Sequence, residues 1–204
     1  MNRKRIYYIL FFVVLFFAFV GIMSWIIPGF TKTNIPPISQ VTPFRFTTQD
    51  STTFTEKDTQ GKVAAVEYFF TTCKGICPRM NNNMRVVYNQ FKGEKDFMIL
   101  SHTSDPATDN PAQLKRYADS MQVNTAQWVF LTGRKDSLYS MARHAYKIDD
   151  PANNLTSIDD DFLHSQFVAL VNKKGDVVKI YDALKPSEMK QMAGEIKKLL
   201  EQQL

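Results

Sequence analysis

Apolar residues near the amino terminus form one uninterrupted run. The 22 residues from Ile6 to Ile27 carry no charge and are rich in Phe, Val, Ile and Leu. A helix of this length rises about 33 Å, which is enough to cross the hydrocarbon core of a bilayer. Trp25 near one end and Tyr7-Tyr8 near the other suit the two membrane interfaces. We therefore predict a transmembrane anchor over residues 6–27.

Prolines among polar residues mark the segment that follows the anchor. Pro28, Pro36, Pro37 and Pro43 all lie within residues 28–43. Such a segment is typical of a semi-extended tether, with a reach of at most roughly 50 Å. The folded domain is then expected over residues 44–204.

Short apolar runs alternate with stretches of helical spacing after residue 43. A short hairpin is expected over Phe44–Thr55, and the predicted strands are Val63–Phe70, Phe97–Leu100, Trp128–Leu131, Phe167–Val171 and Val177–Tyr181. Helices are predicted after Pro78, after the expected N-caps Asn110 and Asp136, and at the carboxyl end around Met189–Leu200. This order predicts an α/β domain with a mixed sheet, parallel first and antiparallel at one side. A thioredoxin-like fold with an added hairpin fits it.

The positive charge of the chain is concentrated at the amino terminus. The formal net charge is +5, of which Arg3, Lys4 and Arg5 supply three, so the remaining chain carries +2. Without a basic stripe, nucleic acid is excluded as a partner. Positive charges ahead of the span place residues 1–5 in the cytoplasm and the domain outside it, as in a bacterial inner-membrane protein with a periplasmic domain. A cleaved signal peptide is the alternative, although its apolar core would be shorter, about 7–15 residues.

Two cysteines, Cys73 and Cys77, lie at the junction between a predicted strand and a predicted helix, and the chain has no others. Their sulfurs can chelate one metal ion or close a disulfide. Pro78 suits the first turn of a helix, which places Cys77 at the helix start, where the dipole favours a thiolate. A purely structural disulfide would stabilise little, because it closes a very short loop.

The three histidines are candidates for a third ligand. His144 is expected on a helix surface, and His102 in the loop Ser101–Pro106 that follows a strand. His164 lies at the entry to the strand Phe167–Val171. Loops at one edge of a parallel sheet converge on one crevice, so spacing favours His164 only weakly over His102.

Two thiolates and one imidazole form a soft, incomplete ligand set. A closed structural zinc site needs four protein ligands. Cu(I) favours thiolate at low coordination number, and Cu(II) accepts imidazole. The residues therefore favour an open copper site that can bind the metal and release it. Met80 and Met84 are also soft, but their helical spacing assigns them to the core.

Several ordered motifs resemble those of one known family. The segments Thr71–Pro78, Thr103–Asp109, Leu131-Thr132-Gly133 and Leu163-His164-Ser165 are similar to T-x-C-P-x-x-C-P, S-V-D-P-x-x-D, L-T-G and D-H-S. Over roughly residues 44 to 200 the chain resembles the Sco/SenC family, membrane-tethered thioredoxin-like proteins that help assemble the copper centre of respiratory cytochrome oxidases. Lys74-Gly75 replaces the usual Pro-Asp, and Leu163 replaces the usual Asp.

The resemblance implies that Cys73, Cys77 and His164 coordinate one copper ion, and it selects His164 over His102. It implies a metallochaperone rather than an enzyme, with a respiratory oxidase copper subunit and a copper donor protein as partners. A thiol-disulfide oxidoreductase that reduces the cysteines of a metal-receiving partner stays open, as does a copper or redox sensor. The three residues between the cysteines, and a histidine rather than a proline before Phe167–Val171, favour metal.

Overall fold

The computed structural model describes residues 3–26, 36–150, 163 and 165–202. The chain divides into two compact units, Met1–Pro36 and Pro37–Leu204. The second unit begins ahead of Phe44, because Ser39–Gln40 forms a strand at the sheet edge inside the expected tether.

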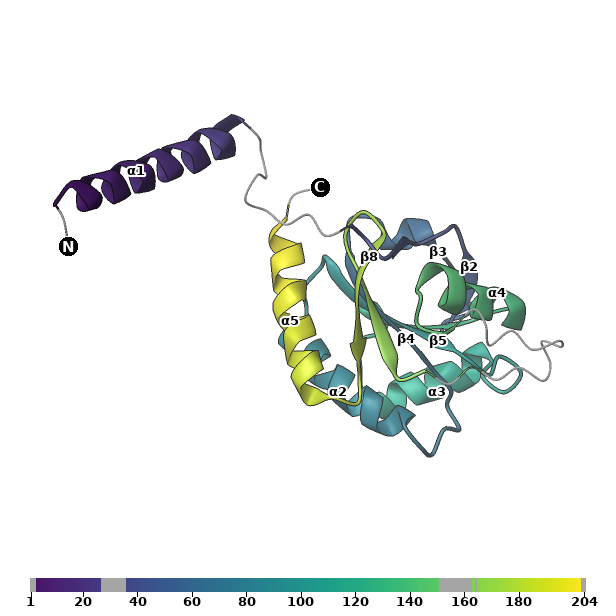
Figure 1. Ribbon diagram of the computed structural model, residues 1–204. Coiled ribbons are helices and arrows are strands. Elements are labelled where there is room, and N and C mark those ends of the chain that lie inside the picture. Colours follow the sequence, from purple (N-terminus) through teal and green to yellow (C-terminus); the bar gives the residue numbers. More distant parts are fainter. Residues whose placement is uncertain (1–2, 27–35, 151–162, 164, 203–204) are drawn as a thin grey trace. The chain divides into compact units, whose positions relative to one another are not determined.

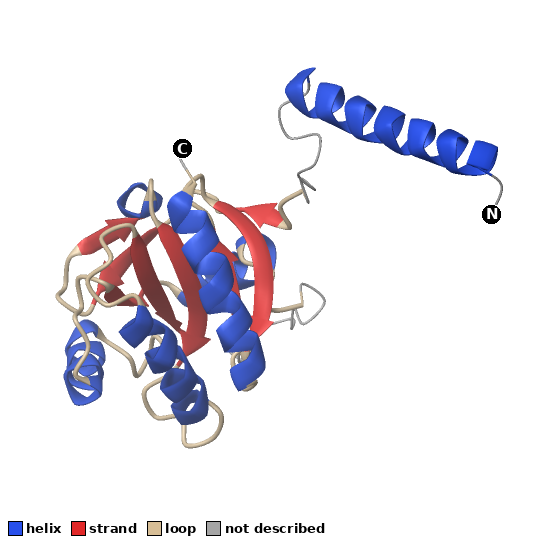
Figure 2. Cartoon of the chain, turned by 90° about the vertical axis from the view of Figure 1, so that its left-hand side faces the viewer, coloured by secondary structure: helices blue, strands red, loops and turns tan. Residues whose placement is uncertain are grey.

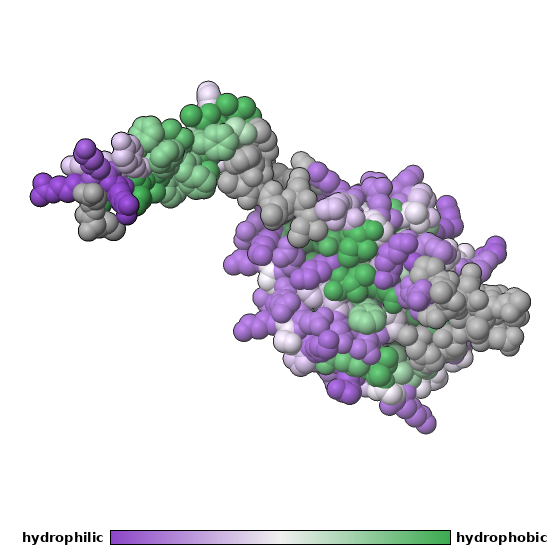
Figure 3. All heavy atoms as spheres, in the orientation of Figure 1, coloured by the Kyte–Doolittle hydropathy of each residue, from purple (hydrophilic) through white to green (hydrophobic). Residues whose placement is uncertain are grey.

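The first unit contains one helix, α1 (Arg3–Ile26). None of its side chains is buried, and most of its surface is hydrophobic (Figure 3). By length and composition, this helix of 24 residues is long and apolar enough to cross a membrane. Residues 6–26 of the apolar run that predicted the anchor therefore lie in one continuous helix.

An eight-stranded mixed sheet forms the centre of the second unit (Figures 1 and 2). The strands are β1 (Ser39–Gln40), β2 (Arg45–Thr48), β3 (Thr53–Thr55), β4 (Val63–Phe69), β5 (Phe97–Thr103), β6 (Trp128–Thr132), β7 (Phe167–Val171) and β8 (Asp176–Asp182). Their order in the sheet is β1-β8-β7-β4-β5-β6-β2-β3. The central strands β4, β5 and β6 are parallel, and antiparallel strands flank them on both sides. The expectation of antiparallel strands at one side only is wrong, because the β2–β3 hairpin joins β6.

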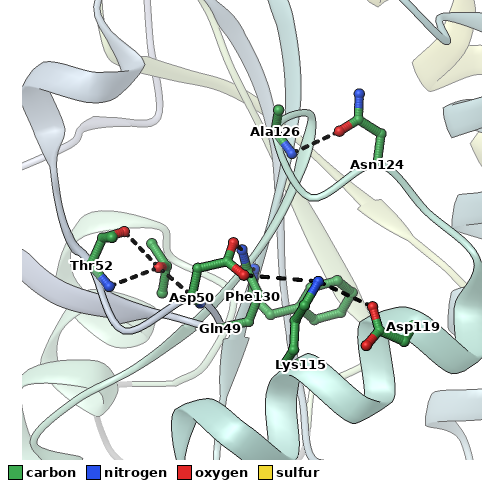
Figure 4. Close-up of polar contacts among 9 residues, drawn as sticks. Gln49, Asp50, Thr52, Lys115, Asp119, Asn124, Ala126 and Phe130 are labelled. Atoms are coloured by element: carbon green, nitrogen blue, oxygen red, sulfur yellow. Dashed lines mark hydrogen bonds and ion pairs between the residues drawn. The ribbon is translucent and has the colours of Figure 1, made fainter.

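That hairpin is fastened to its neighbours by polar contacts (Figure 4). The backbone N–H of Gln49 donates to the carbonyl of Phe130 at 3.0 Å, and the Gln49 side chain accepts from the Phe130 N–H at 2.9 Å. Lys115 belongs to the helix α3 (Pro111–Met121), and its Nζ lies 3.8 Å from the Oδ1 of Asp50 and 3.1 Å from the Oδ1 of Asp119. Long-range pairing of this kind is invisible in the local sequence pattern, which explains the error about the sheet edge.

Helices cover both faces of the sheet. The helices α2 (Cys77–Gln90), α3 (Pro111–Met121) and α5 (Pro186–Glu201) contribute to one core cluster, and α4 (Lys135–Ser140) with the π-helical turn Met141–Ala145 contributes to the other. A 3-10 turn, Glu56–Thr59, follows β3. Successive residues of β4 alternate between the two clusters, as the near-continuous apolar run predicts for a strand covered on both faces.

Two predicted boundaries need correction and one cap is confirmed. Asn110 caps α3, accepting from the Gln113 N–H at 3.0 Å. Asp136 does not cap α4, which begins at Lys135 with Arg134 as its N-cap; Asp136 pairs with Arg134 instead. Strand β5 continues to Thr103, so His102 lies in the sheet and not in a loop.

Candidate metal centre

The two cysteines occupy different kinds of backbone. Cys77 is the first residue of α2, followed by a proline in the first turn, and only 4% of it is exposed. Cys73 is half-buried in the loop between β4 and α2, where its N–H donates to the carbonyl of Phe70 at 3.1 Å. One thiol is thus held by a helix and the other by a turn.

Both cysteines are free thiols, and their side chains are hydrogen-bonded to each other. Burial opposes ionisation of Cys73, but the Cys77 thiol and the backbone N–H groups of Cys77, Gly75 and Ile76 donate to its sulfur and together lower its pKa. Burial and the hydrogen bond to Cys73 raise the pKa of Cys77 to about 12. The expectation that the helix start makes Cys77 the thiolate is wrong, because burial and the hydrogen bond to Cys73 raise the pKa of its thiol. Cys73 is the thiol that ionises.

Iodoacetamide is expected to alkylate Cys73 faster than Cys77 at pH 7.5, by more than about tenfold, because the thiolate is the reacting form and Cys77 is also shielded. Peptide mass spectrometry after quenched reaction times measures both rates. In urea the two rates should become similar, which is the internal control. Modification of Cys77 ahead of Cys73 would contradict the assignment.

The third predicted ligand, His164, lies outside the described residues. Its neighbours are held in place: the Leu163 N–H donates to the Tyr139 hydroxyl at 3.1 Å, and the Ser165 hydroxyl donates to the carbonyl of Ile148 at 2.7 Å. Within the described residues no group of three His, Cys, Asp or Glu side chains could hold a metal ion. Coordination by His164 therefore stays a prediction.

His102 is excluded as a ligand by the sheet itself. Its strand neighbour is Tyr68, and its ring packs against Phe46, Tyr68 and Tyr146 with centroids 5.2, 5.0 and 5.5 Å apart. These rings belong to one core cluster, whereas Cys77 belongs to the cluster on the opposite face. Burial lowers the pKa of His102 to about 3, so the imidazole is neutral. His144 is exposed, as predicted.

A buried carboxyl group lies on the same side of the sheet as Cys77. Glu67 is fully buried; the Ser101 hydroxyl donates to its Oε1 at 2.6 Å, and the Trp128 indole donates to the Ser101 oxygen at 2.8 Å. Burial raises the pKa of Glu67 to about 7, against a smaller opposite effect of the Ser101 hydrogen bond. The charge of Glu67 is among the groups that raise the pKa of Cys77. Glu67 is a carboxylic residue within the apolar run Val63–Phe70, and its partner Ser101 comes from a neighbouring strand 34 residues away.

The chemistry open to this loop is that of a soft, surface-accessible dithiol. Met80 and Met84 are fully buried in the core, as predicted. Two adjacent sulfurs, one of them readily ionised, can chelate a thiophilic metal ion or exchange with a disulfide. The thiols present thus fit a soft metal ion such as copper.

Comparisons with known proteins converge on one family. The sequence model of the SCO1/SenC family matches residues 33–201. The SCO1 protein homolog of Bacillus subtilis is 29% identical over 162 residues, which cover 78% of this chain and 81% of that protein. The structure is similar to that of BsSco, a member of the Sco family of cytochrome c oxidase assembly proteins in which a disulfide switch was identified: the TM-score is 0.69 at 27% identity, covering 83% of this chain and 98% of that one. Yeast Sco1, solved with copper bound, shares the fold with a TM-score of 0.61 at 23% identity, covering 84% and 97% of the two chains.

Proposed function

Because the chain belongs to the SCO1/SenC family, we propose that it is a membrane-anchored copper chaperone for the copper centre of a respiratory cytochrome oxidase. The observation that carries the proposal is the pair of adjacent thiols, Cys73 and Cys77, in the loop at the start of α2. BsSco is a cytochrome c oxidase assembly protein, and yeast Sco1 was solved with copper bound.

Copper is the cargo of this site, so the site must both bind and release it. Cys73 supplies an ionisable sulfur at the surface, and Cys77 a second sulfur from the helix start. We propose His164 as the third ligand on the strength of the family motif. Three ligands leave copper with an open coordination position, which suits transfer to another protein.

The anchor defines where the transfer would occur. We propose a cytoplasmic amino terminus over 1–5, an anchor over 6–27, a tether over 28–43 and a periplasmic copper-binding domain over 44–204. Arg3, Lys4 and Arg5, which lie at the start of α1 and ahead of its apolar run, support this orientation in a bacterial inner membrane. The proposed partners are the copper subunit of the oxidase and a copper donor protein.

Thiol-disulfide exchange is the second candidate function, favoured by the lowered pKa of Cys73. The Cys73 thiolate would attack a partner disulfide, forming a mixed disulfide and releasing one partner thiolate. Cys77 would then displace the second partner sulfur, so that the partner gains two electrons and this chain is left with a Cys73–Cys77 disulfide. A copper or redox sensor would use the same pair.

Copper titration of the reduced chain tests the proposal. We expect one copper per chain with thiolate-to-Cu(II) charge-transfer absorption, and loss of that absorption in the variants Cys73→Ser and Cys77→Ser. His164→Ala should weaken Cu(II) binding by at least about 100-fold, since even outer partners of a ligand are worth 10–100-fold. Its thiols should stay oxidisable. Exposed His144→Ala is the matched control and should bind like the wild type.

Two outcomes would overturn parts of the proposal. Unchanged Cu(II) binding by His164→Ala would remove His164 from the ligand set. A copper-free chain that reduces disulfides catalytically and has no measurable copper affinity would establish the oxidoreductase instead.

A further inference from the structure

Asp109, in the loop before α3, is a fully buried carboxylate that joins three segments of the chain. Its Oδ2 accepts from the Thr71 N–H at 3.0 Å and from the Thr103 hydroxyl at 2.6 Å. Its Oδ1 accepts from the Thr71 hydroxyl at 2.5 Å. Hydrogen bonds to a charged acceptor are stronger than neutral ones, so these contacts hold their donors firmly.

Thr71 is the residue that connects this carboxylate to the thiol loop, because it lies two positions before Cys73. Besides donating twice to Asp109, its hydroxyl accepts from the Gln113 side chain of α3 at 3.0 Å. Both the backbone and the side chain of Thr71 are therefore fixed, by groups that belong to the loop before α3 and to α3 itself.

Asp109 is also anchored in the sheet, by Thr103. Thr103 is the last residue of β5, and it is fully buried. Its hydroxyl also accepts from the Asp105 N–H at 2.9 Å, and the Asp109 N–H donates to the Asp105 carbonyl at 2.8 Å. Asp109 thus transmits the position of a rigid strand end to the loop that carries Cys73.

This anchoring matters because the two sulfurs are held differently. Cys77 is part of α2 and moves only with the helix. Cys73 lies in the loop, so the position of its sulfur depends on where the loop is attached. Thr71 supplies that attachment.

We propose that Asp109 is a positioning residue for the thiol pair: through Thr71 it holds the β4–α2 loop so that the Cys73 sulfur stays beside the Cys77 sulfur. The metal-binding consequence rests on the proposed function, whereas the thiol–disulfide consequence does not. Groups that orient a ligand without touching the metal are worth about 10–100-fold in affinity.

Four variants of the full-length chain in detergent test the proposal. Thr71→Val removes the hydroxyl and keeps the side-chain shape, and Thr71→Ser keeps the hydroxyl. Thr48→Val removes a buried hydroxyl of β2 whose hydrogen-bond partners are Asp50 and Thr52, and it is the matched control for general stability. Asp109→Asn tests the carboxylate directly, and circular dichroism reports whether it folds.

Each variant is measured in two ways. Cu(II) titration gives the affinity and the electron paramagnetic resonance signature of the bound ion. Equilibration with reduced and oxidised glutathione, in the absence of copper, gives the equilibrium constant for Cys73–Cys77 disulfide formation, in which the disulfide forms as oxidised glutathione is reduced. The expected result for Thr71→Val is a Cu(II) affinity lower by about tenfold or more, an altered signature and a shifted glutathione equilibrium constant. Thr71→Ser should restore all three, and Thr48→Val should leave them near the wild type even where it lowers the unfolding temperature.

The proposal is overturned if Thr71→Val matches the wild type in both measurements. It is also overturned if Thr48→Val changes the site as much as Thr71→Val, because the effect would then come from fold stability. A further outcome separates the two proposals: the wild type binds no copper, Thr71→Val shifts the glutathione equilibrium, and Thr71→Ser restores it. That outcome would contradict the proposed copper function and support the positioning role of Asp109.

Discussion

Replacing His102 with phenylalanine is expected to remove a large part of the acid sensitivity of the folded unit. An ordinary histidine has a pKa of 6.5, whereas burial lowers that of His102 to about 3. The unfolded chain therefore takes up a proton as the pH falls below 6.5, while the folded chain does not until about pH 3. The stability that His102 contributes is present above pH 6.5 and is lost as the pH falls through its folded-state pKa.

The expected loss is about 3 kcal/mol at pH 4 and about 4 kcal/mol at pH 3, at 1.36 kcal/mol per pKa unit. His102→Phe should not show this loss, because phenylalanine binds no proton and the site is lined by aromatic rings. Neither ring nitrogen of His102 has a hydrogen-bond partner in the described part of the chain, so the substitution breaks no bond seen there. Burial raises the pKa of Tyr68 and Tyr146, which keeps these neighbours neutral throughout.

Urea unfolding of residues 37–204, followed by the fluorescence of buried Trp128, measures the effect between pH 7 and pH 4. The difference in unfolding free energy between variant and wild type should grow as the pH falls. His144→Phe changes an exposed histidine and should track the wild type. A difference that stays constant with pH would show that His102 is not held neutral by burial.

Replacing Glu67 with glutamine should have the opposite pH dependence. The pKa of this carboxyl rises from 4.5 to about 7 in the folded chain, because it is fully buried. Above pH 4.5 the unfolded chain releases the proton that the folded chain retains, so stability falls as the pH rises through 7. The neutral amide of Glu67→Gln mimics the protonated acid, keeps an acceptor for Ser101 and does not lose this stability. At pH 8 the variant should gain about 3 kcal/mol over the wild type, relative to their difference at pH 4.5.

The same urea experiment measures the Glu67 effect, best in a Cys73→Ser, Cys77→Ser background that removes thiol ionisation. Exposed Glu201→Gln is the control. Parallel curves for Glu67→Gln and its parent across this range would contradict the raised pKa. Between about pH 4.5 and 6.5, stability due to His102 rises with pH while stability due to Glu67 falls with pH. The unfolding free energy of the wild type should therefore change less with pH in this range than that of His102→Phe or Glu67→Gln.

Local sequence was sufficient for features that depend on short-range physics. The uncharged run Ile6–Ile27 predicted α1, because a long apolar helix needs no partner to be recognised. The N-cap of α3 followed from Asn110-Pro111, whose capping contact spans three residues. The apolar run before Cys73 predicted a strand over Val63–Phe70, and β4 spans Val63–Phe69.

Local sequence failed where polar residues are satisfied by distant partners. Ser101 and His102 look like the start of a loop, yet both belong to β5 because that strand pairs with β4 as far as Thr103. Ser101 is hydrogen-bonded to Glu67 and Trp128. His102 packs against aromatic rings from β2, β4 and the segment after the π-helical turn. Neither environment is encoded within the segment itself.

The thiol loop shows the same division at the site. The spacing of Cys73 and Cys77, the strand before them and the helix after them are local, so the sequence alone predicted a reactive dithiol at a strand-to-helix junction. Which thiol ionises was decided by tertiary structure, because burial raises the pKa of Cys77 while hydrogen bonds lower that of Cys73. The attachment of the loop was also decided there, since Asp109 reaches Thr71 from 38 residues away. Residue type and spacing determine which chemistry is available, but desolvation and long-range hydrogen bonds exist only once the chain is packed.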